Sequence, residues 1–226
     1  MFQSFDRITV ISLRARTDRR AETAAELQRH GVLLHRITWH IADKPTATPP
    51  NWSRYTLGTY GCYTSHLQVL KNFLASTATR MLVLEDDVHL TRSDVTVPDH
   101  SMVYFGALRR QIHHIGWETL ADNDGIVGLH CYGVTRAAAA ILVSDLEAAM
   151  VRQDGDPLGG PCHVDGAISM IRERHGIPTA LLGPAIALQR SSATDIHPLA
   201  WYDRAPIVRS LVARLRAARN RIHDHL

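Results

Sequence analysis

Lysine is almost absent from this 226-residue sequence, because Lys44 and Lys71 are the only two among 25 basic residues. Basic residues that are nearly all arginine favour forked contacts to phosphate or carboxylate groups over diffuse charge. Cysteine is also scarce, with three residues at positions 62, 131 and 162 and no CxxC pair. This spacing argues against a disulfide framework or a zinc clip, so we expect three reduced thiols.

Long hydrophobic runs are missing as well. No apolar run approaches the roughly 20 residues that a membrane span requires, and no basic segment precedes an apolar stretch at the N-terminus. We therefore expect a cytoplasmic protein. The sequence contains no internal repeat or low-complexity segment, and 45% hydrophobic residues allow a substantial core. These properties predict one domain over residues 1–200.

Alternating strand and helix signals run through this domain and predict an α/β fold. Thr17 is expected to cap the first helix, Gly31 to end it, and Thr135 to cap the third. Prolines and small polar residues make residues 43–58 a long loop of the kind that often covers a site. We predict strands at residues 8–13, 33–39, 81–84, 102–105, 128–134 and 179–188, and helices at 17–31, 59–75, 135–150 and 164–175.

Residues 201–226 differ in character from the rest. Beyond Pro206 an apolar stripe faces away from a surface crowded with arginines, which predicts a basic amphipathic C-terminal helix. Such a helix either docks on the core with solvated arginines or contacts a membrane surface peripherally. The tail lacks the interleaved aromatic residues of a single-strand nucleic-acid platform, so nucleic acid is an unlikely partner.

Three adjacent carboxylates, Glu85, Asp86 and Asp87, follow the apolar strand at 81–84. They sit at the carboxyl end of a strand, where open α/β sheets place ligands. Adjacent carboxylates repel one another unless a cation neutralises them, and hard oxygen ligands suit Mg²⁺ or Mn²⁺. The alternative is a solvated acidic turn.

Other polar residues gather near predicted element ends. Arginines 14, 16, 19 and 20 follow the first strand and can reach a nucleotide or diphosphate, or form a solvated face. Ser65 and His66 lie near a helix start, where a histidine is more often a core residue than a ligand. Asp165 is either the cap of the helix that follows or a general base. The polar segment 189–197 ends at His197, a candidate metal ligand.

These segments, in this order, resemble glycosyltransferase family 25, the lipooligosaccharide and procollagen galactosyltransferase group. The resemblance covers most of residues 8–197, and the GCYTSH and LVLEDDV stretches at their mutual spacing are its most specific part. Ser12 stands where the family often has asparagine. The matching stretches are VISLRARTDRR (10–20), GCYTSH (61–66), LVLEDDV (82–88), GLHCYG (128–133), HVD (163–165) and the serine-rich segment ending at Ile196.

The resemblance implies a GT-A-type fold, an open mixed Rossmann-like sheet with helices on both faces. It further implies an inverting, metal-dependent transfer of a hexose, galactose or glucose, from a UDP-sugar to a saccharide or glycolipid acceptor such as lipooligosaccharide. Asp165 corresponds to the acid near the acceptor and is the candidate catalytic base. The candidate metal ligands are Asp87, Glu85 and His197, and the candidate nucleotide-sugar contacts are Ser12, Leu13, Arg14, Arg16, Arg19, Ser65, His66, Glu85 and Asp86.

Three rival functions fit parts of the pattern. A nucleotidyltransferase shares the sheet and the metal acids, but usually has a glycine-rich phosphate loop after its first strand, and SLRARTDRR contains no glycine. A non-catalytic nucleotide-sugar-binding scaffold would not need all three acids at 85–87. A transferase acting on a protein or nucleic-acid acceptor is the third alternative.

Overall fold

The computed structural model describes residues 1–106 and 114–190. The predicted C-terminal helix, the domain boundary at residue 200 and His197 therefore lie outside the described residues. Among the described helices, none combines the length and the apolar character that crossing a membrane requires.

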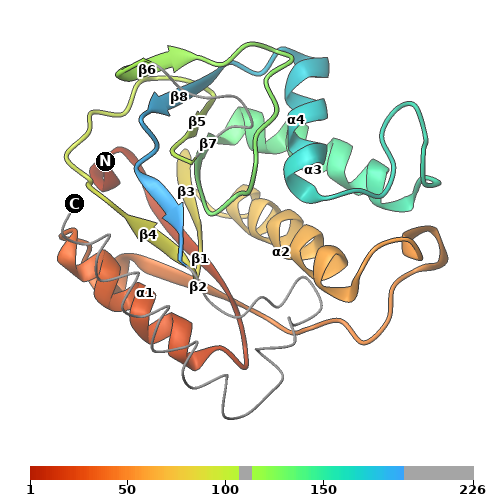
Figure 1. The fold of residues 1–226 in the computed structure, drawn as a ribbon, viewed down its shortest axis with the longest axis horizontal. Coiled ribbons are helices and arrows are strands. Elements are labelled where there is room, and N and C mark those ends of the chain that lie inside the picture. The colour runs from red at the N-terminus through yellow and green to blue at the C-terminus, as the bar shows by residue number, and fades with distance from the viewer. Residues whose placement is uncertain (107–113, 191–226) are drawn as a thin grey trace.

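A seven-stranded mixed sheet forms the centre of the molecule, in the order β2-β1-β3-β7-β5-β8-β6 (Figure 1). β1 pairs in parallel with β2 and β3, whereas β7 runs antiparallel to both of its neighbours, β3 and β5. A separate pair, β4 with β9, lies next to the sheet. The strand bounds are β1 Arg7–Leu13, β2 Ile37–Ala42, β3 Arg80–Glu85, β4 Val88–Leu90, β5 Met102–Tyr104, β6 Gly116–Thr119, β7 Cys131–Thr135, β8 Thr179–Gly183 and β9 Ala187–Gln189.

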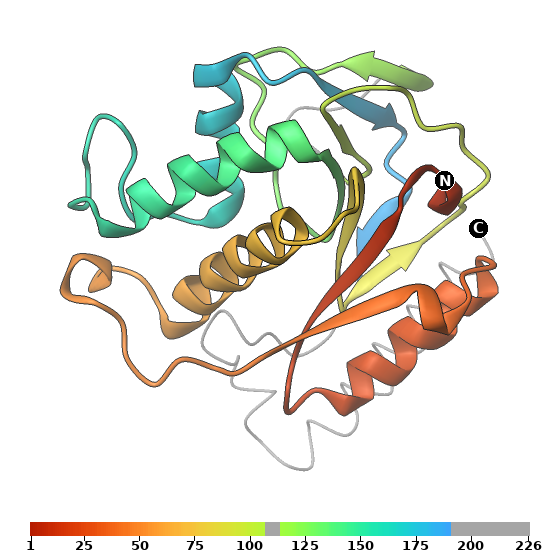
Figure 2. The same ribbon diagram turned by 180° about the vertical axis from the view of Figure 1, so that it is seen from behind.

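Helices cover both faces of the sheet. α1 (Thr17–Arg29) lies on one face, and α2 (Leu57–Leu74), α3 (Arg136–Val151) and α4 (Val164–His175) lie on the other (Figure 1, Figure 2). Successive side chains of a strand point to opposite faces of the sheet and so pack in both layers. In β3, Met81 and Val83 pack with α2 and α3, while Leu82 packs on the α1 side. The predicted architecture, an open mixed α/β sheet with helices on both faces, is confirmed.

Several local predictions are also confirmed. The side-chain oxygen of Thr135 accepts a hydrogen bond from the amide of Ala138 and caps α3. α2 and α4 appear where their apolar spacing predicted them. The predicted loop at 43–58 contains one short 3-10 turn, Pro50–Trp52, whose buried indole donates a hydrogen bond to the carbonyl of Met150.

Other boundaries were wrong for identifiable reasons. Residues 34–36 form a 3-10 turn, so β2 begins at Ile37, and Arg16, not Thr17, precedes the first helical residue of α1. The single strand predicted at 179–188 is two strands, separated at the cis Gly183-Pro184 bond, because proline cannot donate to a β-ladder. β4 and β6, of three and four residues, are too short for a periodic pattern to reveal.

Candidate functional site

A cavity of about 680 Å³ lies where β1 and β3 end side by side. The long loop covers one side of it through Lys44 and Pro45, and the start of α4 lies on the other side. Because β1 and β3 are parallel, their carboxyl ends meet at one edge of the sheet, which is where such sheets bind ligands. The predicted site residues that line the cavity are Ser12, Leu13, Arg16, Arg19, Ser65, His66, Glu85, Asp86, Asp87 and Asp165.

Arg19 neutralises two of the three adjacent carboxylates. Its Nη1 lies 3.1 Å from Asp86 Oδ1 and 3.3 Å from Asp87 Oδ2, and all three side chains are buried. The arginine is in the first turn of α1, where a cation opposes the helix dipole. Its position there is explained by the carboxylate pair that it contacts, a role that the sequence did not indicate.

Each of these carboxylates keeps one oxygen with no hydrogen bond. Asp86 Oδ2 and Asp87 Oδ1 are buried and have no partner among the described residues. Burial, followed by the negative charge of Glu85, raises the pKa of Asp87 to about 6. Arg19 therefore compensates the pair only in part, and two buried carboxylate oxygens are the donors that Mg²⁺ or Mn²⁺ prefers. The residues fit a divalent metal.

Glu85 belongs to a different cluster from its two neighbours. Its Oε1 lies 3.1 Å from Nε2 of the buried His66, and the other ring nitrogen lies 3.2 Å from the hydroxyl of Tyr132. Burial opposes ionisation of Glu85, but the hydrogen bond from His66 holds the pKa of Glu85 below its usual value. The expectation that one cation faces all three acids is therefore too simple: His66 pairs with one and Arg19 with two.

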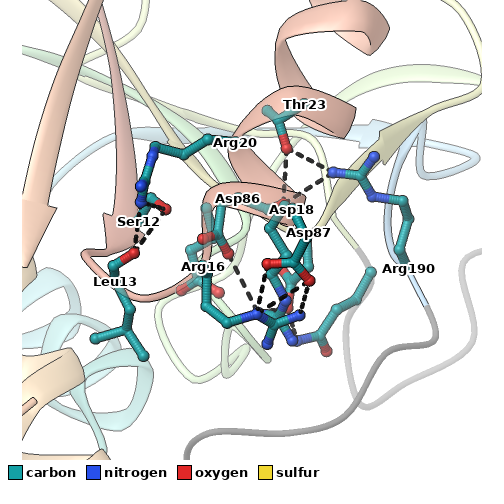
Figure 3. Close-up of polar contacts among 12 residues, drawn as sticks. Ser12, Leu13, Arg16, Asp18, Arg20, Thr23, Asp86, Asp87 and Arg190 are labelled. Atoms are coloured by element: carbon teal, nitrogen blue, oxygen red, sulfur yellow. Dashed lines mark hydrogen bonds and ion pairs between the residues drawn. The ribbon is translucent and has the colours of Figure 1, made fainter.

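The backbone of the acidic turn is fixed by α1 and by the end of β9. Thr23 Oγ1 and Arg190 Nη2 donate to the carbonyl of Asp86 at 2.7 and 2.8 Å, as Figure 3 shows. The Arg190 amide donates to the Asp87 carbonyl at 2.7 Å, and Gln189 Nε2 donates to Asp87 Oδ2 at 3.0 Å. Sequence reasoning chose His197 from this polar segment; His197 lies outside the described residues, and within them Gln189 and Arg190 reach the turn. Their position directly after an apolar strand was the available signal.

The other arginines after β1 have different roles. Arg14 is exposed, pairs with Asp43 and does not line the cavity. Arg16 lines the cavity and forms an ion pair with Asp18 at 2.9 Å. Arg20 donates to Ser12 Oγ and to the Leu13 carbonyl, so it supports the end of β1 (Figure 3). The structure therefore brings Arg16 and Arg19 to the site but not Arg14.

Asp165 lies in the first turn of α4 and joins this helix to the loop before β7. Its Oδ2 accepts a hydrogen bond from the Gly128 amide at 2.9 Å. Ser169 Oγ accepts from the Ile126 amide, and the buried Arg172 donates to carbonyls of residues 120, 121, 122 and 124. Since His163 precedes the first helical residue, Asp165 is not the N-cap. It lines the cavity and also anchors its neighbouring wall.

Residues 5–96 match glycosyltransferase family 25 (LPS biosynthesis protein). No curated protein matches the chain. The resemblance deduced from the sequence is confirmed over these residues.

Solved structures show weaker likenesses. A glycosyltransferase involved in glycosylation of the major capsid of PBCV-1 is 14% identical, with 67% of this chain and 68% of that chain covered and a TM-score of 0.36. Galactosyltransferase LgtC, solved with donor and acceptor sugar analogues, is 13% identical over 77% and 72%, with a TM-score of 0.39. CTP:phosphocholine cytidylyltransferase LicC from Streptococcus pneumoniae is 12% identical over 81% and 92%, with a TM-score of 0.40. All three scores are too low to support a statement about function.

The family 25 match spans one side of the cavity wall. It includes β1, α1, α2 and the acidic turn, and hence Arg19, His66 and the triplet at 85–87. Asp165 and the loop at 120–129 lie beyond the matched residues. The matched residues therefore include the ends of β1 and β3, and the rest of the wall lies outside the match.

Proposed function

We propose that this chain transfers a hexose, galactose or glucose, from a UDP-sugar to a saccharide acceptor such as lipooligosaccharide, with inversion at the anomeric carbon. The observation that carries the proposal is the Asp86–Asp87 pair, with two unpartnered buried oxygens at the junction of β1 and β3. This junction opens into a cavity that is also lined by a separate carboxylate, Asp165. A divalent ion on one side and a base on the other are what an inverting transfer needs.

Asp86 and Asp87 are the residues that would hold Mn²⁺ or Mg²⁺. When bound, such an ion stabilises the negative charge that develops on a departing diphosphate. Arg19 keeps the two carboxylates in place and offsets part of their mutual repulsion. Arg16, Ser12 and Leu13 line the adjoining wall, which suits contacts to the nucleotide.

Asp165 is the proposed base for the acceptor. Its carboxylate takes the proton of the acceptor hydroxyl while that oxygen bonds to C1 of the donor sugar and the bond from C1 to the diphosphate breaks. One displacement of this kind inverts C1 and needs no covalent nucleophile on the protein. The Gly128 amide fixes one carboxylate oxygen, which orients the group in the cavity wall.

The test is a screen of UDP-, GDP- and CMP-sugars for thermal stabilisation and donor hydrolysis, in Mn²⁺, in Mg²⁺ and in EDTA. We expect a UDP-hexose to stabilise the chain and to be hydrolysed slowly only when a metal is present. Glycosylation of a saccharide acceptor should then give a product with the opposite anomeric configuration to the donor, read by NMR couplings.

Two results would refute the proposal. Donor binding without any turnover on saccharide acceptors would make the chain a nucleotide-sugar-binding scaffold. Full activity in EDTA would remove the metal role of Asp86 and Asp87. A cytoplasmic location and a membrane contact through residues 201–226 stay predictions.

A further inference from the structure

A second group of potential metal ligands lies in the same cavity, on the α2 side of β3. The thiol of Cys62, the imidazole of His66 and the carboxylate of Glu85 each offer one ligand atom, and these atoms lie within 4.8 Å of one another. Cys62 and His66 are four residues apart in α2, so they share one side of the helix. All three residues line the cavity.

We propose that Cys62, His66 and Glu85 bind Zn²⁺ at a site separate from the Asp86–Asp87 pair. The two ligand sets differ in chemistry: a thiolate and an imidazole suit Zn²⁺, whereas a pair of carboxylates suits Mg²⁺ or Mn²⁺. Three protein ligands leave a fourth position that faces the cavity. That arrangement is typical of a zinc site open to water or to a small molecule, and it differs from a closed structural site.

The hydrogen bonds of His66 are already arranged as such a site requires. Its Nε2 faces Glu85 Oε1, and its Nδ1 lies 3.2 Å from the Tyr132 hydroxyl. Zn²⁺ would replace the proton between His66 and Glu85, and Nδ1–H would then donate to the Tyr132 oxygen. Zinc-bound histidines almost always donate their second ring N–H in this way, which fixes the ring and its tautomer. The Cys62 thiol loses its proton to solvent on binding.

The end of β3 and the turn after it keep the two sites apart. Glu85, the last residue of β3, contacts His66 on α2, whereas Asp86 and Asp87, in the turn that follows, contact Arg19 on α1. Zinc bound by Cys62, His66 and Glu85 would leave the Asp86 and Asp87 carboxylates paired with Arg19. The zinc site lies in the cavity assigned to the donor, so bound Zn²⁺ should inhibit transfer. The binding claim itself does not depend on the proposed activity.

Cobalt titration of the full chain tests the site directly, because Co²⁺ in a thiolate site gives a near-ultraviolet charge-transfer band that oxygen ligands do not give. Excess Mg²⁺ keeps the carboxylate pair occupied. We expect one equivalent of Co²⁺ to produce the band and Zn²⁺ to abolish it. Cys62→Ser should remove the band and weaken Zn²⁺ binding, by competition with a chromophoric chelator, by more than the ~10–100-fold typical of outer-shell changes.

Cys162→Ser is the matched control, because Cys162 is also half-buried and is not part of the ligand cluster. This variant and Asp87→Asn should both keep the band. If Cys62→Ser does not fold, as judged by circular dichroism, the smaller Cys62→Ala takes its place. A band that survives loss of Cys62, or that disappears in Asp87→Asn, overturns the proposal. The cobalt band is measured without any transfer assay. A failure of the zinc proposal can therefore be distinguished from a failure of the proposed sugar transfer.

Discussion

Replacing Asp87 by asparagine should make the protein more stable and inactive. In the folded chain burial and the charge of Glu85 raise the pKa of Asp87 from 3.8 to about 6. At neutral pH the folded state therefore carries an ionised carboxylate at a cost of about 3 kcal/mol. The neutral amide of the variant avoids this cost, which already includes the opposing attraction of Arg19, 3.3 Å from the carboxylate. We expect a gain of up to about 3 kcal/mol, or roughly 6–12 °C in Tm.

The sign of the pH dependence follows from the same pKa. Between pH 3.8 and about 6 the unfolded chain has released the Asp87 proton while the folded chain still holds it. Stability must therefore fall as pH rises through this window and stay lower above it. The difference in unfolding free energy between Asp87→Asn and wild type should be near its minimum at pH 4 and reach its full value by pH 7.

Urea denaturation at pH 4, 5, 6, 7 and 8 in EDTA measures this difference, and Asp122→Asn, at an exposed aspartate, is the matched control. Addition of Mn²⁺ should stabilise wild type, since binding to the folded state adds stability. It should not stabilise Asp87→Asn, which should also fail to transfer sugar. A variant that is no more stable than wild type at pH 7 would show that Arg19 fully compensates Asp87. Wild-type turnover in Mn²⁺ would remove Asp87 from the site.

Three further predictions concern other contacts of the cavity and of α1. Arg19→Met should destabilise the chain by about 3–5 kcal/mol, because it leaves two buried carboxylates without their cation. In urea denaturation Mn²⁺ should restore part of the lost stability. The control, Arg14→Met at an exposed ion pair, should be as stable as wild type. Asp165→Asn should lower kcat by about two to four orders of magnitude with unchanged UDP-sugar affinity; unchanged turnover would leave it as only a contact to Gly128. For Glu26, burial opposes ionisation, but the His30 imidazole 3.8 Å away, His89 at 3.1 Å and the hydrogen bond from the Leu90 amide hold its pKa well below the usual value. Stability from this group is lost as pH falls below about 4.5, so Glu26→Gln should flatten the acid side of the pH–stability curve, and an unchanged curve would contradict the assignment.

Local signals were enough to predict much of the fold. The apolar run Met81–Leu84 followed by three acids placed the triplet at a strand end, and Thr135 marked a helix start, because both signals come from neighbouring residues. The pairing of β4 with β9 could not be predicted in this way, since His89 and Leu188 pair across 99 positions of sequence. Pairing at such separation is decided by the tertiary structure and leaves little trace in local pattern.

The sequence predicted most residues of the candidate site, but not which of them contact one another. The four-residue spacing of Cys62 and His66 could have placed both on one side of a helix, whereas the division of the triplet between His66 and Arg19 depends on the turn that follows β3. Whether Arg19 or Arg14 contacts the acidic turn depends on where α1 begins relative to β1. Local sequence propensity does not determine such a helix boundary. His197 lies outside the described residues, so its predicted role as a metal ligand stays a prediction.

The face that α1 turns toward the sheet is unusual in its chemistry. Its buried residues are Arg19, Thr23, Glu26 and Leu27, and three of these four are polar. An apolar helix face can slide or rotate slightly at small cost, but these side chains bind particular atoms: the carboxylates of 86 and 87, the carbonyl of 86 and the amide of 90. Inserting one residue early in α1 would turn every later side chain by about 100° and separate these partners. The helix should therefore tolerate substitution on its outer face but no change in length, whereas the loop at 152–162, far from these contacts, should accept insertions during divergence of the sequence.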